Sequence, residues 1–284
     1  MAERKKEEEG SVMHETNADW LEGFPRDDAI TALLLPGTHD TMTASCGARY
    51  YRTQTLSLSE QLSAGVRFLD IRLRRDMRAA HREWVSTIDA DAIFGTCASF
   101  LQEHGTEFLL MRIQNANEKK DDYEAYGAAL HEKIANWSDL FYHREEGSFA
   151  WPTLGACAGK VVALECAPPK YGFSRMAGRT WAENWHGNPR ISLQDLWDGP
   201  TEAEKQDAIR AQMEQSARLP QDVLSLSHIS ATNGELGFPD AFARRMNPYS
   251  LALLKEMPAA RGALIYDFIT PAICEAVIAR NGKR

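Results

Sequence analysis

Apolar positions along the chain follow two patterns that take turns. Short apolar or alternating segments, typical of buried strands, are separated by longer segments in which apolar residues recur at steps of three and four, typical of amphipathic helices. This alternation indicates repeated βα units. Strands are expected at residues 30–35, 66–74, 107–114, 160–166, 223–229 and 262–268.

Capping signals mark where the intervening helices begin and end. Ser57 and Glu60 form a capping box that opens one helix, and Gly65 closes it before the next strand. Helices are expected over residues 58–64, 89–104 and 123–137, from a second box at residues 201–204, and after Pro239 and Pro271.

The strands and helices together favour an α/β fold, an irregular (β/α) TIM-like barrel in a single domain, with an open doubly wound sheet as the alternative. A barrel usually has eight strands, and residues 168–190, rich in Gly, Pro and Trp, have room for an irregular strand or a loop that covers substrate. The 284 residues, 44% of them hydrophobic, suit one large core. We assign residues 18–284 to the barrel and residues 1–17 to a disordered, charged tail.

The net charge and the cysteine content limit the possible binding partners and cellular compartments. The net charge of −8 argues against a nucleic-acid binder and against electrostatic adsorption to anionic bilayers. We expect neither a membrane span nor a secretory signal, and hence a protein that is cytoplasmic or exported without a signal peptide. We also expect a monomer. The five cysteines are odd in number and widely spaced, which favours reduced thiols.

Candidate chemistry begins at residues 35–40, L-P-G-T-H-D, where an apolar run breaks and presents His39 and Asp40. In the following strand, alternation sends Asp70 and Arg72 to one face, and two charges inside a barrel are costly unless they are paired or used. If the sheet closes, its first and last strands become neighbours and Asp267 comes beside His39. An aspartate that accepts one ring N–H of a histidine makes the other nitrogen a better base.

A metal site is the competing interpretation, because His39, Asp40, Asp70 and His81 are all acceptable ligands. No HxH, HExxH or CxxC spacing occurs, and an arginine among the carboxylates competes with any cation. We therefore expect no metal and no cofactor, with Arg72 stabilising a phosphate through its charge and forked donors.

The chain resembles bacterial-type phosphatidylinositol-specific phospholipase C, the PLC X-domain fold. The resemblance is carried by L-P-G-T-H-D-T-M at residues 35–42, G-V-R-F-L-D-I-R at residues 65–72, and a late strand ending in Tyr266, Asp267 and Phe268. The order of elements agrees over most of residues 20–280.

The resemblance implies an intramolecular transfer that gives inositol 1,2-cyclic phosphate and diacylglycerol. By this resemblance, His39 is the general base for the inositol 2-hydroxyl and His81 the general acid for the diacylglycerol oxygen. Arg72 holds a phosphate oxygen, Asp267 orients His39, and Asp40 and Asp70 tune the arginine and the acid. Family members that use calcium carry acidic ligands in place of such an arginine, so Arg72 places the chain with the metal-independent group.

Four further residues are expected to bind substrate. Asp195 and Trp197 stand where the family has an inositol-binding aspartate and a stacking aromatic, and Arg112 and Gln114 end a strand, with Glu165 expected on the same inner face. The family usually has glycine after the second histidine, where this chain has Arg82. It also places a lysine near Gln114 and an arginine near Cys166, and this chain keeps neither charge.

Two other functions stay open at this point: a metal-dependent glycerophosphodiester or sphingomyelin-type phosphodiesterase, and a catalytically silent module that binds lipid or inositol phosphate. We rank the phospholipase first because two histidines flanking an arginine suit general acid–base transfer. The expected partner is a phospholipid at a membrane surface, contacted peripherally through Tyr50, Tyr51, Trp84 or the loop at residues 181–185.

Overall fold

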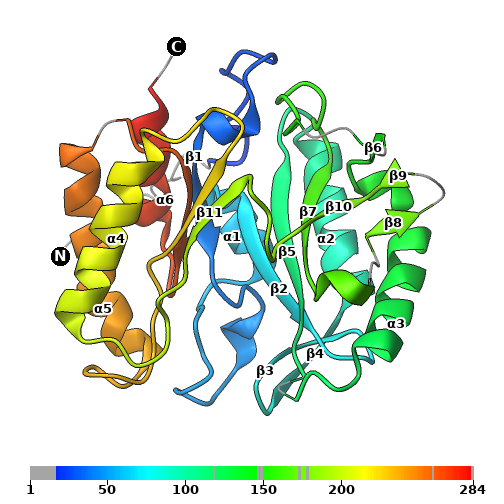
Figure 1. Cartoon of the computed structure of the whole chain (residues 1–284), viewed down its shortest axis with the longest axis horizontal. Helices are drawn as coiled ribbons and strands as arrows, with labels where there is room; N and C mark the ends of the chain where they lie inside the picture. The colour runs from blue at the N-terminus through cyan, green and yellow to red at the C-terminus, as the bar shows by residue number, and fades with distance from the viewer. Residues whose placement is uncertain are drawn as a thin grey trace, which may run out of the picture.

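The structure, a computed structural model, describes residues 17–282 apart from residues 118, 146, 148–149, 172–173, 177–178 and 258. Nearly all of the expected tail therefore lies outside the described residues, and the division at residue 17 stays a prediction. In the described part, helices cover the outside of a strongly curved sheet (Figure 1).

Eight parallel strands make up the curved sheet, and each pairs with the next along one path. In spatial order they are β10 (Ala182–Asn184), β7 (Val161–Cys166), β5 (Leu109–Asn115), β2 (Phe68–Leu73), β1 (Leu34–Thr38), β13 (Gly262–Tyr266), β12 (Leu224–His228) and β11 (Ile191–Gln194). The path ends at β10 and β11, so the sheet is a TIM-like half-barrel. The predicted irregular barrel is confirmed, and the doubly wound alternative is wrong.

Shorter strands stand outside this path. An antiparallel hairpin extends from β2, and a small sheet stands apart from the barrel. The hairpin strands are β3 (Arg78–His81) and β4 (Trp84–Asp89), and the small sheet contains β6 (Arg144–Glu145), β9 (Arg179–Thr180) and β8 (Arg175–Met176).

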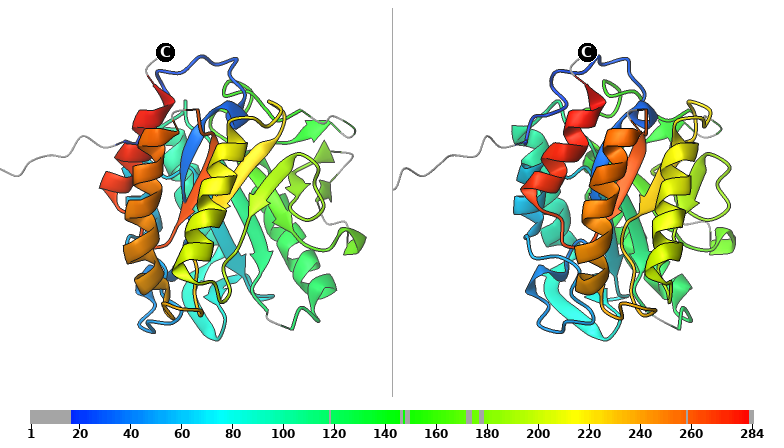
Figure 2. Two further views of the ribbon diagram at one scale, coloured as in Figure 1. Left: turned by 60° about the vertical axis from the view of Figure 1, so that its left-hand side comes forward. Right: turned by 90° about the vertical axis from the view of Figure 1, so that its left-hand side faces the viewer.

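All six expected helices are present. They are α1 (Leu58–Ala64), α2 (Ala90–Glu103), α3 (Tyr123–Asn136), α4 (Glu202–Ser216), α5 (Pro239–Glu256) and α6 (Pro271–Ile278). Both predicted capping boxes form, at Ser57 with Glu60 and at Thr201 with Glu204. Short 3-10 helices are η1 (Ile30–Ala32), η2 (Thr43–Ser45), η3 (Ser138–Leu140), η4 (Pro169–Tyr171) and η5 (Ala279–Asn281). Figure 2 shows α4, α5 and α6 side by side on the outer face of the sheet.

The first strand begins later than its sequence predicts. The expected strand at residues 30–35 is partly wrong, because η1 takes its first half and β1 continues through Pro36 and Gly37. A Cβ on Gly37 would stand 2.9 Å from the Cβ of Phe68, so only glycine lets β1 and β2 approach this closely. The Pro36 carbonyl still accepts from the Arg67 N–H (2.9 Å), and the strand therefore survives the proline.

Two apolar layers position the strands. Leu69, Ile71 and Leu73 of β2 belong to the core between the sheet and the helices. The inner face of the sheet is apolar near its amino end, where Phe68 and Leu110 pack in a second core. Toward the carboxyl end the inner face becomes polar, which is where a barrel builds its active site. Among the described residues, no helix combines the length and the apolar character needed to cross a bilayer.

Candidate active site

His39 lies immediately beyond the carboxyl end of β1, where hydrogen bonds to the end of β13 hold its backbone. Its N–H donates to the Tyr266 carbonyl (3.0 Å). Gln54 Nε2 donates to the carbonyls of both His39 (2.9 Å) and Tyr266 (2.8 Å). Because β1 pairs in parallel with β13, His39 comes beside Asp267, the residue after Tyr266. The predicted pairing of the first and last strands is confirmed.

The contacts of the His39 ring fix its tautomer. Nδ1 is 2.7 Å from Asp267 Oδ1, and Nε2 is 2.7 Å from Arg72 Nη2. A guanidinium can only donate, so Nε2 must carry a lone pair, Nδ1 its proton, and Asp267 must accept. Burial, reinforced by Arg72, holds the pKa of His39 well below its usual value. Burial also raises the pKa of Asp267, but the donor-only Arg72 makes its carboxylate the acceptor in this pair.

Arg72 is held by two buried carboxylates. Its Nε lies 2.8 Å from Asp40 Oδ1, and its Nη2 lies 3.0 Å from Asp70 Oδ2. Burial alone would lower the pKa of Arg72, but the charges of Asp40 and Asp70 outweigh burial and raise this pKa above its usual value. Burial works against the charge on Asp70, but Arg72 and Arg112 outweigh it and keep the pKa of Asp70 below its usual value. The guanidinium is therefore a fixed cation at the end of β2.

His81 reaches the same carboxylate from the other side. It ends β3, as the sequence suggests, and its Nδ1 lies 2.7 Å from the Tyr51 carbonyl, which can only accept. Nδ1 therefore carries a proton, and Nε2 faces Asp40 Oδ2 at 3.2 Å. Asp40 Oδ2 is buried and has no hydrogen-bond partner among the described residues. Burial raises the pKa of Asp40, although the charge of Arg72 opposes this shift.

Asp40 thus connects the two predicted catalytic histidines. Its Oδ2 also lies 3.2 Å from His39 Nε2, and the rings of His39 and His81 have centroids 6.1 Å apart. The six predicted catalytic residues form one continuous network at the carboxyl ends of β1, β2, β3 and β13. Their individual roles stay predictions.

The four predicted substrate-binding residues line one pocket with the histidines and Arg72. The pocket has an empty volume of about 620 Å³, and Arg112, Gln114, Asp195 and Trp197 all face it. Buried polar atoms without a hydrogen-bond partner among the described residues include Arg112 Nε and Gln114 Oε1. Such atoms suit a polar ligand, because an unsatisfied buried donor or acceptor costs about 1–3 kcal/mol.

Arg82 stands at the mouth of this pocket in a strained backbone conformation. Its φ of 53° lies in the left-handed region, in the tight turn between β3 and β4. Its guanidinium carbon lies 5.5 Å from the centroid of the Tyr50 ring and 5.7 Å from that of Trp197. A glycine would adopt this φ without strain, so the arginine is kept at a cost of roughly 1–2 kcal/mol.

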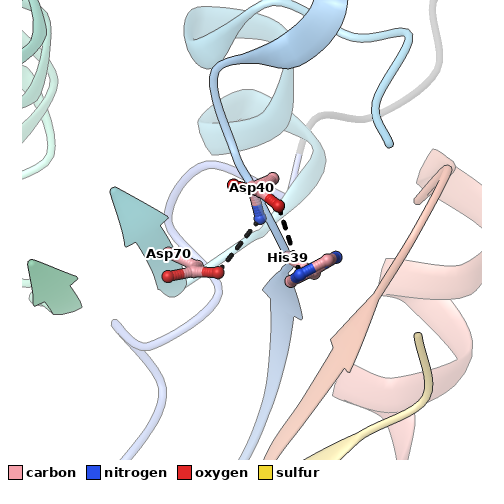
Figure 3. Close-up of side chains that lie close together, drawn as sticks. All are labelled: His39, Asp40 and Asp70. Atoms are coloured by element: carbon pink, nitrogen blue, oxygen red, sulfur yellow. Dashed lines mark hydrogen bonds and ion pairs between the residues drawn. The ribbon is translucent and has the colours of Figure 1, made fainter. Parts of the chain in front are cut away.

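Three potential metal ligands lie together beneath the pocket. His39, Asp40 and Asp70 each offer an atom within 4.8 Å of the others. Figure 3 shows Asp40 beside the His39 ring, with Asp70 accepting from the Asp40 backbone N–H. The same carboxylates, however, bind the Arg72 guanidinium through Asp40 Oδ1 and Asp70 Oδ2. A metal ion would have to displace this cation, so the residues present fit an arginine-centred site.

Two expectations about side-chain direction are wrong. The sequence predicts Glu165 on the inner face with Gln114, but Glu165 pairs in register with Ile113 and faces the helix side of the sheet. Burial there raises the pKa of Glu165 to about 7. The sequence also offers Trp181 and Trp185 to a membrane, but both are buried, because the segment that carries them forms β10 and packs on the barrel.

Sequence reasoning did not assign three further residues to the site. His228 ends β12, and its ring centroid is 5.6 Å from that of His39. Gln54 clamps β1 to β13, and buried Lys205 of α4 donates to the Leu196 carbonyl (2.7 Å), beside Asp195 and Trp197. Only the position of His228 near a strand end could have indicated a site, since the other two act through contacts between distant segments.

Comparisons with known proteins agree with this geometry. The chain is 29% identical over 282 residues to a 1-phosphatidylinositol phosphodiesterase of Listeria monocytogenes, covering 94% of this chain and 86% of that protein. It superposes on the solved phosphatidylinositol-specific phospholipase C of Listeria monocytogenes with a TM-score of 0.85 and 25% identity, over 93% of this chain and 98% of the other.

A Staphylococcus aureus phosphatidylinositol-specific phospholipase C structure gives a TM-score of 0.78 at 20% identity, over 94% of this chain and 98% of that chain, which supports the fold. No protein-family model matches the chain. The chain is thus homologous over about nine tenths of its sequence to bacterial 1-phosphatidylinositol phosphodiesterases and shares the half-barrel of phosphatidylinositol-specific phospholipase C.

Proposed function

We propose that this protein cleaves an inositol phospholipid without a metal ion, by intramolecular transfer that releases diacylglycerol and inositol 1,2-cyclic phosphate. The observation that carries the proposal is the connected row of Asp267, His39, Arg72 and Asp40 ending at His81. Base, phosphate-binding cation and acid stand in the order that a transfer between two oxygens of one phosphate requires.

His39 acts as the base in the first step. Its Nε2 has the lone pair, and Arg72 donates to it when no substrate is bound. The inositol 2-hydroxyl takes the place of this donor, and Arg72 turns its N–H groups to a phosphate oxygen while Asp70 keeps the guanidinium in place. The hydroxyl oxygen attacks phosphorus as its proton passes to His39, and Asp267 stabilises the imidazolium that forms.

His81 acts as the acid in the same step. In this proposal its Nε2 transfers a proton to the diacylglycerol oxygen as the bond between that oxygen and phosphorus breaks, and Asp40, 3.2 Å away, stabilises the protonated ring before transfer. The Tyr51 carbonyl holds the Nδ1 proton, so only Nε2 can deliver. Asp40 also keeps Arg72 aligned through its second oxygen.

The same contacts support metal independence. The two carboxylates that would bind a divalent ion already neutralise Arg72, and Arg72 supplies the positive charge that the phosphate needs. The alternative of a metal-dependent phosphodiesterase requires Asp40 and Asp70 to release the guanidinium. Both ion pairs of Arg72 with these carboxylates therefore weigh against this alternative.

The pocket suits a headgroup with many hydroxyls. Arg112 offers donors, Gln114 and Asp195 offer acceptors, and Trp197 offers a flat apolar face. This chain keeps neither the lysine that the family pattern has near Gln114 nor the arginine near Cys166, so hydroxyl recognition relies on Arg112, Gln114 and Asp195.

The rim of the pocket supports contact with a lipid surface. Trp197 is 39% exposed and Phe238 38% exposed, and Arg49 lies over the Phe238 ring at 4.2 Å. Aromatic rings beside cations suit the boundary between headgroups and acyl chains. The Staphylococcus aureus phosphatidylinositol-specific phospholipase C binds membranes, and that binding can be modulated. We expect F238A, which leaves the pocket lining unchanged, to weaken vesicle binding while retaining hydrolysis of monomeric substrate.

The decisive experiment incubates the protein with phosphatidylinositol vesicles in excess EDTA and follows products by phosphorus NMR. The proposal expects a cyclic phosphate and its loss in H39A, while H131A, a substitution on the outside of α3, serves as the matched control. EDTA-sensitive turnover would refute the role of Arg72. Vesicle binding without turnover would instead identify a silent binding module.

A further inference from the structure

One of the five cysteines has surroundings unlike the others. Cys46, Cys97, Cys157 and Cys274 are buried, and burial raises the pKa of each thiol, to about 12 in the last three. Burial would do the same to Cys166, but Arg112, followed by His186, reverses the effect and brings the pKa of this thiol below its usual value.

The contacts of Cys166 explain the difference. Cys166 ends β7, and its Sγ lies 3.4 Å from Arg112 Nη2 and 3.3 Å from His186 Nε2. The guanidinium carbon of Arg112 lies 4.2 Å from the centroid of the Trp185 ring. His186 follows Trp185 in the chain. The sulfur thus faces two nitrogen donors. His186 is exposed to solvent, so the imidazole forms the outer cover of the buried sulfur.

Cys166 is also connected to the candidate active site. Register places Gln114 between Cys166 and Arg72 at the same level of the sheet, so the sulfur stands two strands, roughly 10 Å, from the catalytic guanidinium. Arg112, which donates to Cys166, also lies 3.4 Å from Asp70 Oδ1, and Asp70 holds Arg72. A change at the sulfur therefore reaches Arg72 through two ion pairs.

We propose that Cys166 is a nucleophilic thiolate, formed by the Cys166–His186–Arg112 cluster, and that small disulfides modify it reversibly and thereby inhibit the enzyme. The inhibition rests on the proposed function, whereas the modification does not. The thiolate, rather than the thiol, is the reacting form, and adjacent cations favour it.

The step is a thiol–disulfide exchange. Cys166 Sγ attacks one sulfur of a small disulfide, a new S–S bond forms to the protein, and the disulfide's own S–S bond breaks. The second sulfur leaves as a thiolate and takes the proton of the His186 imidazolium. An added thiol reverses the exchange, so the net reaction needs no other oxidant or reductant.

Modification has a defined effect on the pocket. The mixed disulfide is neutral, so Arg112 loses one of its two anionic partners and pairs more strongly with Asp70, in competition with Arg72. The added group also occupies space beside Gln114, which lines the pocket. Both effects lower turnover on phosphatidylinositol.

The test uses methyl methanethiosulfonate, which transfers a small methylthio group, on the full folded chain at pH 7. Peptide mapping by mass spectrometry should find the group on Cys166 well before the other four cysteines, and dithiothreitol should remove it. H186A should slow this modification on the order of tenfold, whereas H131A should not. A native protein that resists the reagent, or reacts first at another cysteine, would overturn the proposal.

Activity measurements separate the two claims. Treated protein should lose most of its turnover and regain it with dithiothreitol, while C166S should keep its own untreated rate in the presence of the reagent. Modified Cys166 with undiminished turnover would overturn the inhibition. Untreated protein without phospholipase activity would refute the proposed function alone, because the mapping result still decides whether Cys166 is the reactive thiolate.

Discussion

Replacing Asp267 by asparagine, the substitution D267N, tests whether the charge of this side chain supports His39. The change keeps the shape of the side chain and, with the amide oxygen toward Nδ1, the hydrogen bond of 2.7 Å. It removes the negative charge that stabilises the imidazolium formed when His39 takes the substrate proton. Two unit charges about 4 Å apart interact by about 4 kcal/mol at an effective dielectric constant near 20. The transition state should lose a stabilisation of this order.

This loss predicts a fall in kcat of about 10³-fold, because each 1.36 kcal/mol corresponds to about tenfold in rate. The pH profile supplies a second measurement. His39 works as a base above its pKa, which burial and Arg72 already lower, and removing the carboxylate lowers this pKa further. The acid limb of kcat/KM should therefore move to lower pH in D267N, while the plateau falls.

The assay measures cyclic phosphate release by phosphorus NMR, with D207N, the same substitution at an exposed site on α4, as the control. Thermal unfolding of both variants excludes a loss of fold as the cause. A D267N enzyme within threefold of the native kcat, with its acid limb in place, would refute the assignment of Asp267 as the partner of the base.

Three further predictions address the acid, a buried ion pair and acid stability. H81A should lose far more activity on phosphatidylinositol than on an inositol phosphate ester with a nitrophenol leaving group, which needs no proton; equal losses would contradict the acid role. R67M should lower the free energy of unfolding in urea by about 3–5 kcal/mol, because Glu107, which lies 2.7 Å from Arg67, would then be buried without a cation. A loss below about 1 kcal/mol would contradict this prediction. Burial lowers the pKa of His228 to about 4, so unfolding takes up a proton between about pH 4 and 6.5. The free energy of unfolding should therefore fall by about 3 kcal/mol as the pH drops through this range. An equally steep fall in H228Q would refute the role of His228.

Local signals in the sequence predicted the fold where a few adjacent residues decide the structure. The two capping boxes located the starts of α1 and α4, because each box satisfies backbone donors within one turn. Residues 168–190 were expected to hold an irregular strand or a loop, and β10 lies there. Its bounds, and β11 as a whole, escaped prediction because these strands contain only three and four residues, too few for a pattern to be visible. The continuation of β1 through Gly37 depended on the close approach of Phe68, a contact between separate segments.

The residues of the site likewise fall into those that the sequence could predict and those that it could not. Sequence alternation placed Asp70 and Arg72 on one face, and the order of strands brought Asp267 to His39. Residues that support these groups through distant contacts gave no signal: Gln54 and Lys205 carry no motif, and their roles depend on which carbonyls lie nearby. A resemblance can transfer a catalytic residue by its motif, but a supporting residue has to be found in the structure.

The position of the gap in the barrel connects these observations. The sheet is interrupted between β10 and β11, which follow each other in sequence, while the two ends of the chain meet where β1 pairs with β13. His39 and Asp267 are thus held by an unbroken ladder of hydrogen bonds, whereas Asp195, Trp197 and His186 lie beside the gap. Catalytic geometry tolerates displacements of only about 0.5 Å, so the rigid seam suits the base and its carboxylate. Headgroup contacts and the Cys166 cluster lie on the open side, where substitution and modification can change specificity or rate while the pairing of His39 with Asp267 stays intact.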